Sequence, residues 1–486
     1  MFYPSLEEIK TTAESGEYRT APVSMEILSD IKTPIEVMRI LKSVSEHCYM
    51  LESITDNEKW GRYTFLGYDP KLEITCTDGK MNVGELSFVT CEPGKHIKEI
   101  LEEHKSARYP GLPTFTGGLV GYFSYDYLKY AYPTLKLDAQ DNEGFRDVDL
   151  MLFDKVIAFD NYRQKIVLIV NIFLDNYEAN FNQAKAELHK MSDLICRGQP
   201  HREKAGRLKS EITALYDRKK YCSMVKQVQR YITDGDIKQA VLSNRLEAEY
   251  EGSLFNAYRI LRTLNPSPYM FYFSSPDMEV AGASPETLVK LENGVLHTFP
   301  LAGTRPRGKT EDEDKKLEEE LLADPKELSE HNMLIDLGWE DIEKISKAGS
   351  VSVEKYHSIE RYSHVMHIGS AIRGEIAQDK QALDAIDAIL PAGTLSGAPK
   401  IRACQLINDI ENNKRGIYGG AIGYLDFTGN LDTCIAIRIA YKKNGKVFVR
   451  SGAGIVAGSV PEKEHQECIN KAAAVIGALR LAEDLL

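Results

Sequence analysis

The stretch TLVKLENGVLHTF, residues 287–299, decides the fold class of this chain. Its central Asn293-Gly294 pair suits the positive φ angles of a type I′ turn, so the apolar segments on both sides are predicted to pair as an antiparallel hairpin. The same signal recurs at Asn444-Gly445, between IAIRIAY and KVFVR, and at Asp78-Gly79, between LEITC and KMNV. Repeated hairpins indicate that the sheets of this protein are antiparallel.

Helical patterns lie between these groups of strands. They are predicted over residues 177–195, 216–233, 325–345, 383–389, 399–408 and 461–485. A further strand pair is predicted at VIAF (156–159) and KIVLIVNIF (165–173). Hairpin groups with helices inserted between them predict an α+β protein rather than repeated β-α-β units. The polar, basic stretch 197–210 predicts a boundary between an N-terminal part, residues 1–205, and a C-terminal part, residues 206–486.

Composition and charge exclude several classes of protein. The chain has 486 residues, 43% of them hydrophobic, so it can bury a large core without a metal ion or disulfides. Its formal charge of −12 argues against a nucleic-acid binder or a membrane-surface binder, because both need basic patches. The eight cysteines are scattered without a C-x-x-C pair, which is typical of reduced cysteines. Since no signal-peptide pattern is present and the most apolar segment, 166–174, is too short to cross a bilayer, we expect a soluble cytoplasmic protein.

Two stretches combine helix-start signals with regularly spaced acidic residues. In DPKELSEH (324–331), Asp324 is a plausible N-cap and Pro325 suits the first helical position. In SVPEKEHQECINK (459–471), a helix is predicted to begin around Pro461. Spacings of three and four place two sets of side chains each on one helix face: Glu327, Glu330 and His331 in the first, and Glu464, Glu467 and Lys471 in the second. Two such faces either hold a hard divalent cation such as Mg²⁺ or are solvated helix surfaces.

Four glycine-rich segments form a third group: PLAGTRPRG (300–308), PAGTLSGAPK (391–400), GIYGGAIGY (416–424) and RSGAGIV (450–456). Glycine lets backbone N–H groups approach an anion closely, and Arg305, Lys400 or Arg438 would add positive charge. These segments indicate either a site for a small carboxylate-bearing molecule or tight turns in a sheet. Two familiar motifs are excluded, because 452–458 lacks the G-x-G-x-x-G spacing and GTLSG is not the G-x-S-x-G of a hydrolase.

Taken in order, these segments resemble the chorismate-utilising enzymes, and within them the anthranilate synthases of the component I type. Further matching segments are GDIKQAVLSNR (235–245), NPSPYMFY (265–272), AGASPETLV (281–289) and ERYSHVMH (360–367). In the N-terminal part, LESITDNEKWGRYTFLG (51–67) is similar to the L-L-E-S segment of the tryptophan-regulated synthases. The resemblance implies an α+β fold of two packed antiparallel β-sheets surrounded by helices, with chorismate and Mg²⁺ bound in a cleft.

The resemblance also implies roles for individual residues. Glu330 and Glu467 would bind Mg²⁺, supported by Glu327 and Glu464. A second set would hold the substrate's carboxylates: Tyr418, Arg438, the backbone of Gly452, Ala453 and Gly454, and, beside the ion, Lys471. A third set would act on the reacting groups: Glu286 as the acid that protonates the departing ring hydroxyl, His367 in the loss of pyruvate, and Thr394 as a substrate-contacting hydroxyl. For that role, burial or like charge should raise the pKa of Glu286.

Two absent lysines indicate a branch of the family. Relatives that add water carry a lysine base where this chain has Gln239, and aminodeoxychorismate synthases carry a lysine nucleophile where it has Ala302. The resemblance therefore implies that ammonia adds to chorismate directly and that the product, aminodeoxyisochorismate, loses pyruvate to give anthranilate. Two alternatives stay open: an aminodeoxyisochorismate synthase that stops before elimination, and a tryptophan-binding regulator that has lost catalysis.

Two partners and one departure complete the expectations. Since the chain shows no nucleophilic-cysteine elbow of a glutaminase, a separate glutamine amidotransferase subunit is expected to supply ammonia. Feedback inhibition by L-tryptophan is expected because two segments match the family's regulatory positions: Glu52 and Ser53, and Asn265, Pro266, Ser267, Pro268, Tyr269 and Met270. In one place the sequence departs from the family pattern. Where the family reads L-G-R-N-D-x-G, this chain reads LGWEDIE (337–343), so the packing of this helix and turn, or a contact with a neighbouring subunit, is expected to differ.

Overall fold

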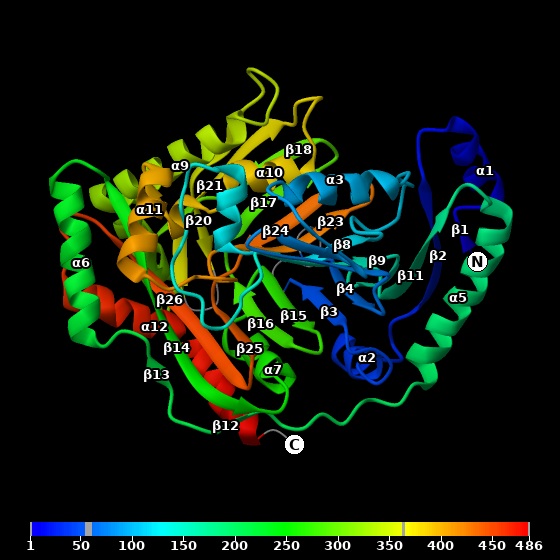
Figure 1. Ribbon diagram of the computed structural model, residues 1–486, viewed down its shortest axis with the longest axis horizontal. Helices are drawn as coiled ribbons and strands as arrows, with labels where there is room; N and C mark the ends of the chain where they lie inside the picture. Colours follow the sequence, from blue (N-terminus) through cyan, green and yellow to red (C-terminus); the bar gives the residue numbers. More distant parts are fainter. Residues whose placement is uncertain (1, 54–60, 362–364, 485–486) are drawn as a thin grey trace.

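The computed structural model describes residues 2–53, 61–361 and 365–484, which form two β-sheets flanked by helices (Figure 1). The first sheet contains, in spatial order, β1 (Phe2–Tyr3), β2 (Thr20–Leu28), β11 (Lys165–Phe173), β10 (Lys155–Asp160), β4 (Tyr63–Tyr68), β3 (Cys48–Glu52), β15 (Tyr269–Ser274), β16 (Met278–Ser284), β25 (Ile439–Lys443), β26 (Lys446–Ile455), β14 (Gln239–Glu251) and β12 (Arg207–Leu208). Two short strands, β13 (Thr213–Ala214) and β22 (Gly397–Ala398), also pair with β14.

The second sheet is built in the same way. In spatial order it contains β19 (Leu301–Pro306), β21 (Val365–Glu375), β18 (Val295–Thr298), β17 (Thr287–Glu292), β24 (Leu431–Ile435), β23 (Ala421–Asp426), β8 (Gly118–Phe123), β9 (Val148–Phe153), β5 (Leu72–Thr77), β6 (Lys80–Val83) and β7 (Leu86–Val89), and β20 (Ser352–Arg361) pairs with β21. The main ladders of both sheets are antiparallel, so the α+β prediction is confirmed.

Helices cover the outer faces of both sheets. They are α1 (Leu6–Ser15), α2 (Pro34–Leu41), α3 (Pro93–Glu103), α4 (Leu128–Ala131), α5 (Tyr177–Arg197), α6 (Arg218–Thr233), α7 (Phe255–Leu264), α8 (Glu311–Leu322), α9 (Pro325–Glu343), α10 (Ala382–Ile389), α11 (Lys400–Glu411) and α12 (Pro461–Leu481), with 3₁₀ turns at Tyr125–Tyr127, Gly393–Leu395 and Ala482–Asp484. All six predicted helices are present, with ends shifted by a few residues. None of the helices in the described ranges is both long and apolar enough to cross a membrane.

Three apolar clusters hold the layers together. One packs α1, α2, α5, α7 and α12 against the first sheet, and a second packs α3, α9 and α10 against the second sheet. A third, rich in aromatic rings, lies between the sheets, where Phe65 of β4 and Tyr424 of β23 have ring centroids 6.1 Å apart. Each sheet is therefore buried on both faces over much of its area, which explains its apolar strands.

The predicted hairpin turns have the expected backbone. Asn293 and Gly294 both have positive φ, at 55° and 78°, between β17 and β18. Asn444-Gly445 and Asp78-Gly79 repeat this geometry between β25 and β26 and between β5 and β6. Because only glycine, and less readily asparagine or aspartate, adopts this conformation at low cost, these pairs fix the strand registers.

The two predicted parts of the chain share both sheets. The N-terminal strand β3 pairs with β15, and the N-terminal strand β8 pairs with β23. The predicted boundary falls in the segment that follows α5, and strands from both sides of it contribute to the inter-sheet cluster. It therefore divides the sequence without dividing the core. In Figure 1, α6, α9, α11 and α12 gather at the left end of the molecule, opposite α1 and α5.

Candidate active site

Glu286 lies where the chain crosses from one sheet to the other. It follows β16 of the first sheet and directly precedes β17 of the second. Its carboxylate accepts a hydrogen bond of 2.9 Å from the hydroxyl of Thr394. Although the side chain is partly exposed, burial raises its pKa to about 7, against the weaker opposing effects of Thr394, Lys471 and Arg438. This confirms the expected shift and leaves Glu286 able to donate a proton near neutral pH.

Arg438 lies at a second crossing beside the first. It connects β24 of the second sheet to β25 of the first, and its backbone is left-handed, with φ of 54°. The two crossings are hydrogen-bonded to each other, from Ile435 N to Glu286 O at 2.9 Å and from Ala283 N to Arg438 O at 3.2 Å. A non-glycine residue in this conformation is strained, so the surrounding ladder must hold it in place.

The guanidinium of Arg438 is the centre of the site. Burial lowers its pKa, while Tyr418, Glu467 and Glu286 act in the opposite direction. These neighbours come from three different elements of the fold, so the structure brings together residues that the sequence separates widely. A partly buried arginine beside a carboxyl group whose pKa is about 7 suits recognition of a carboxylate.

The backbone of Gly452, Ala453 and Gly454, here called the glycine floor, begins next to the hydroxyl of Tyr418. A Cβ atom at Gly452 would come within 2.6 Å of the Leu242 carbonyl oxygen and 3.0 Å of the Tyr418 hydroxyl, so glycine is required there. Lys471 donates to the Gly452 carbonyl at 3.1 Å and forms an ion pair of 2.7 Å with Glu467. Ala453 is buried, and the next residue, Gly454, is exposed on β26. All the residues predicted to hold the substrate therefore border one region.

The candidate metal-binding carboxylates face one another from two helices. Asp324 caps α9, accepting hydrogen bonds from the backbone N–H groups of Lys326 and Glu327, and Val460 with Pro461 begins α12. Burial, followed by the charges of Glu327 and Glu467, raises the pKa of Glu330. Burial and the charge of Glu467 likewise raise the pKa of Glu464, against a hydrogen bond from Ser459. Within the described ranges no three His, Cys, Asp or Glu side chains converge as a complete metal site.

His367 projects from β21 near the same residues. Its Nδ1 donates to the Gly303 carbonyl at 2.8 Å and lies 3.1 Å from the Thr304 hydroxyl. Since a carbonyl only accepts, Nδ1 carries the proton and Nε2 the lone pair of the neutral ring. Burial lowers the pKa of His367, as does the charge of Arg438. His367 is thus a neutral base candidate at physiological pH.

The two other basic candidates from the glycine-rich segments are held in ion pairs. Arg305 forms ion pairs with Asp324 at 2.9 Å and with the candidate site residue Glu327 at 3.6 Å, and Lys400 pairs with Asp341 at 2.6 Å. Of the three basic residues proposed for anion binding, Arg438 lies beside Glu286 and Tyr418, and Arg305 lies beside the candidate carboxylates. His331 is also separated from Glu330, because its ring is fully buried and bonds to Ser370 Oγ at 2.7 Å.

The two predicted regulatory segments lie side by side, and Met270 of the second segment pairs with Ala283, whose N–H donates to the Arg438 carbonyl at 3.2 Å. The register of β3 against β15 places Glu52 opposite Met270, and Ser53 follows β3 directly. Residues 265–268 connect α7 to β15, and the Ser267 hydroxyl donates to the Asn265 carbonyl at 3.1 Å. Tyr269 faces the other way, donating to Asp432 of the second sheet at 2.8 Å. Residues 54–60 of the matching N-terminal segment lie outside the described residues.

Sequence reasoning missed two residues in this region. The buried carboxylate of Glu52 accepts hydrogen bonds from Arg262 Nη2 at 2.9 Å and from the Tyr258 hydroxyl. Both donors belong to α7, at an i, i+4 spacing that places them on one helix face. That spacing was visible in the sequence, but nothing local linked it to a glutamate more than two hundred residues earlier.

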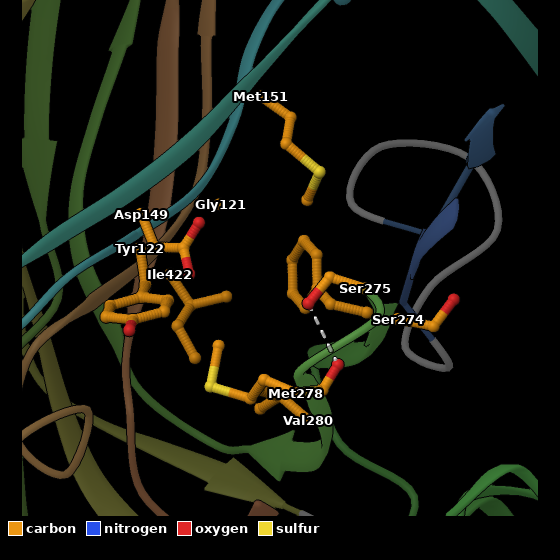
Figure 2. Close-up of a pocket in the computed structure, with 10 residues that line it drawn as sticks. Gly121, Tyr122, Asp149, Met151, Ser274, Ser275, Met278, Val280 and Ile422 are labelled. Atoms are coloured by element: carbon orange, nitrogen blue, oxygen red, sulfur yellow. Dashed lines mark hydrogen bonds between the residues drawn. The ribbon is translucent and has the colours of Figure 1, made fainter. Parts of the chain in front are cut away.

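A cavity between the sheets is not part of this site. Figure 2 shows its lining by Tyr122, Asp149, Met151, Met278 and Ile422, with the Ser275 hydroxyl bonded to the Met278 carbonyl at 3.2 Å. Its volume is about 20 Å³, enough for about one water molecule and far too small for a substituted ring. None of the candidate site residues lines it.

Comparisons with known proteins identify the family. A family model described as chorismate binding enzyme matches residues 9–477. The protein named anthranilate synthase component 1 from Acetivibrio thermocellus is 44% identical over 497 residues, covering 100% of each chain. The protein of the same name from Aquifex aeolicus is 42% identical, covering 99% of this chain and 98% of its own.

Solved structures also match this chain. Anthranilate synthase component I from Streptococcus pneumoniae TIGR4 matches with a TM-score of 0.76 and 34% identity, over 92% of this chain and 98% of that chain. The menaquinone-specific isochorismate synthase of Escherichia coli shares the fold, with a TM-score of 0.71, 19% identity and 98% of both chains covered.

Proposed function

The chain belongs to the family of chorismate binding enzymes, and from this premise we propose how the residues around Glu286 and Arg438 perform its reaction. That reaction is the anthranilate synthase reaction, in which chorismate and ammonia give anthranilate and pyruvate. The observation that carries the proposal is Glu286, a carboxyl group with a pKa of about 7 that is oriented by Thr394 and placed beside Arg438.

Substrate binding comes first. Arg438 receives a carboxylate of chorismate, and the backbone of Gly452, Ala453 and Gly454 supplies the surface on which it rests, with the Tyr418 hydroxyl above. Lys471, already fixed to the Gly452 carbonyl, adds a second positive charge. Two cations near one dianion hold it strongly because the region is partly desolvated.

Proton transfers follow in two stages. Glu286 gives its proton to the ring hydroxyl, which leaves as water, while ammonia, which needs no base to become nucleophilic, adds to the ring, and the ammonium group formed returns a proton to the Glu286 carboxylate. His367 then accepts a ring proton at Nε2, which allows the enolpyruvyl group to depart as enolpyruvate and the ring to become aromatic, and enolpyruvate takes up one proton to become pyruvate. The Gly303 carbonyl keeps the ring of His367 in the tautomer that this step requires.

A bound Mg²⁺ would supply positive charge and Lewis acidity at a substrate carboxylate. Glu330 and Glu467 would hold it, with Glu327 and Glu464 behind them. The residues fit the ion, because hard carboxylate oxygens from two helices are crowded enough that like charge contributes to the raised pKa of Glu330. Two protein carboxylates with substrate oxygens and water completing the shell are typical of Mg²⁺.

One assay tests the reaction. Purified protein is given chorismate, Mg²⁺ and ammonium, and anthranilate and pyruvate are measured together. Equal amounts of both are expected. Aminodeoxyisochorismate without pyruvate would favour the shortened reaction, and no turnover would favour the regulator.

Ammonia supply and feedback are the remaining parts of the proposal. A glutamine amidotransferase subunit would provide ammonia, so glutamine should support turnover only when that subunit is added. L-Tryptophan would bind beside Glu52, Ser53 and Met270, where one anion and apolar side chains lie next to each other. The cytoplasm is the proposed location, consistent with eight free cysteines in the structure.

A further inference from the structure

Three buried charges lie behind the loop that carries Thr394. They belong to Glu411 at the end of α11, to Arg415, and to Arg450 of β26, and each side chain is at most 2% exposed. Burial alone would raise the pKa of Glu411, but the two arginines hold it below its ordinary value. Glu411 therefore remains an anion shared by two cations.

Arg415 reaches beyond this cluster to two backbone carbonyls. Its Nη1 donates to Leu395 O at 2.6 Å, and its Nη2 donates to Val241 O at 2.7 Å. The other side of the guanidinium grips Glu411, through Nε at 3.0 Å and Nη2 at 2.6 Å. Its Cζ lies 4.6 Å from the ring centroid of Tyr125 and 5.8 Å from that of Tyr418. All three nitrogens of the guanidinium therefore donate hydrogen bonds.

Leu395 is the residue after Thr394. Within the 3₁₀ turn that contains both, Gly393–Leu395, Leu395 N donates to Ala392 O at 3.0 Å and Ser396 N donates to Gly393 O at 3.3 Å. The next residue is also tied to β14, because Val241 N donates to Ser396 O at 2.8 Å, and the Leu395 side chain is buried in the core. The Leu395 carbonyl would otherwise be a buried acceptor in an irregular segment, where a missing partner is costly. The bond from Arg415 therefore holds the part of this turn that directly follows Thr394.

We propose that Arg415 is a positioning residue for the general acid, because it ties the turn that bears Thr394 to the fixed strand β14 and so holds the Thr394 hydroxyl against Glu286. The proposal rests on the function assigned above to Glu286. Arg415 touches no reacting group itself. It acts through Leu395, and through its contact with the ring of Tyr418 it also steadies a residue of the substrate site.

Arg450 provides a matched control. It is equally buried and binds the same Glu411 at 3.0 Å, but its other partners are Ser243, Asn413 and Lys414, none of them on the Thr394 turn. Removal of either arginine leaves Glu411 with one cation, so Arg415→Gln and Arg450→Gln change the buried charge identically. The two variants differ in one respect, because only Arg415→Gln removes the donor to the Leu395 carbonyl in the turn that carries Thr394.

The experiment measures kcat and KM for chorismate in wild type, Arg415→Gln, Arg450→Gln, Thr394→Val and the double variant Arg415→Gln/Thr394→Val, with melting temperatures for all. We expect Arg415→Gln to lower kcat by about tenfold or more with KM changed by less than about threefold. Arg450→Gln should lose a similar amount of stability and less than about threefold of kcat. The double variant should be no slower than Thr394→Val alone, because both changes remove one interaction.

Two results would overturn the inference: equal losses of kcat in the two arginine variants, or multiplied losses in the double variant. If Arg415→Gln does not fold, Arg415→Lys, which keeps the charge and one donor, enters the same comparison with Arg450→Lys. A wild-type protein that forms no anthranilate would instead contradict the proposed function, so the two failures are distinguishable.

Discussion

The general acid and the paired carboxylates belong to one site but are held in different ways. Glu286 lies at a crossing between sheets, bonded by Thr394 and flanked by strands. Glu330 and Glu467 project from helix faces and repel each other, although Lys471 pairs with Glu467 at 2.7 Å. Glu286 is therefore positioned by neighbouring protein groups, whereas the two carboxylates carry a mutual repulsion that a bound cation would offset. Substitutions in these two regions should therefore have different effects on catalysis.

The largest effect is expected on the carboxylate side. Glu330→Gln or Glu467→Gln should abolish Mg²⁺-dependent turnover, since a hard-cation site loses one of its two charged ligands. Removing a like charge should leave the melting temperature of the metal-free protein unchanged or raised. Activity assays and thermal unfolding measure both effects. Glu340→Gln and Glu462→Gln, on exposed positions of the same helices, serve as controls. Near-normal activity in both test variants would show that the carboxylates bind no essential ion.

The next effect concerns the acid. Glu286→Gln keeps the shape of the side chain but cannot donate a proton, so kcat should fall by roughly 10²–10⁴-fold. KM for chorismate should change much less, because Arg438 and the glycine floor remain. Steady-state kinetics at saturating Mg²⁺ measures the two separately. An unchanged kcat would mean that Glu286 serves only as a hydrogen-bond acceptor for Thr394.

A smaller effect is expected in the pH profile. Because Glu286 must be protonated to act, kcat at a fixed concentration of free ammonia should fall as pH rises through its pKa of about 7. The Thr394 hydroxyl stabilises the carboxylate and lowers that pKa, so Thr394→Val should move the fall to higher pH. Glu340→Gln, by comparison, should leave the pH of this fall unchanged. If the pH profile of Thr394→Val is the same as that of the wild type, the Thr394 hydroxyl does not affect the pKa of Glu286.

The smallest effect on turnover is expected at the regulatory segments. Ser53→Ala should weaken inhibition by L-tryptophan and leave kcat within about twofold of wild type, because Ser53 has no role in the proposed proton transfers or in holding the substrate. Inhibition curves at fixed chorismate measure this. If millimolar tryptophan leaves the wild-type activity untouched, the matching segments have only a structural role in this chain.

Local signals in the sequence predicted much of the fold. The Asn-Gly and Asp-Gly turns, the Asp324 cap and the helix start near Pro461 each depend on a few adjacent residues, and each was confirmed. The order of strands was less accessible, since β3 pairs with β15 and β8 with β23 across long separations that leave no periodic pattern.

The same difference between local and long-range signals applies to the candidate site. Spacing alone placed Glu330 and Glu467 on helix faces and left a solvated surface as the alternative, and only the resemblance connected them with Glu286 and Arg438. The sheet crossings explain why, because residues at the ends of non-adjacent strands meet there. Arg415 gave only a local signal, its i, i+4 spacing from Glu411, because its bonds to the Leu395 and Val241 carbonyls involve backbone groups that every residue type possesses.

The sharing of both sheets by the two parts of the chain has a consequence for its synthesis. When the ribosome has made only the N-terminal part, β3 and β8 have emerged, but their partners β15 and β23 have not. Two apolar strand edges, of five residues in β3 and six in β8, are then open to pairing with other nascent chains. The newly made N-terminal part should therefore depend on chaperones until translation is nearly complete, and a ribosome that stalls late should leave a product that aggregates.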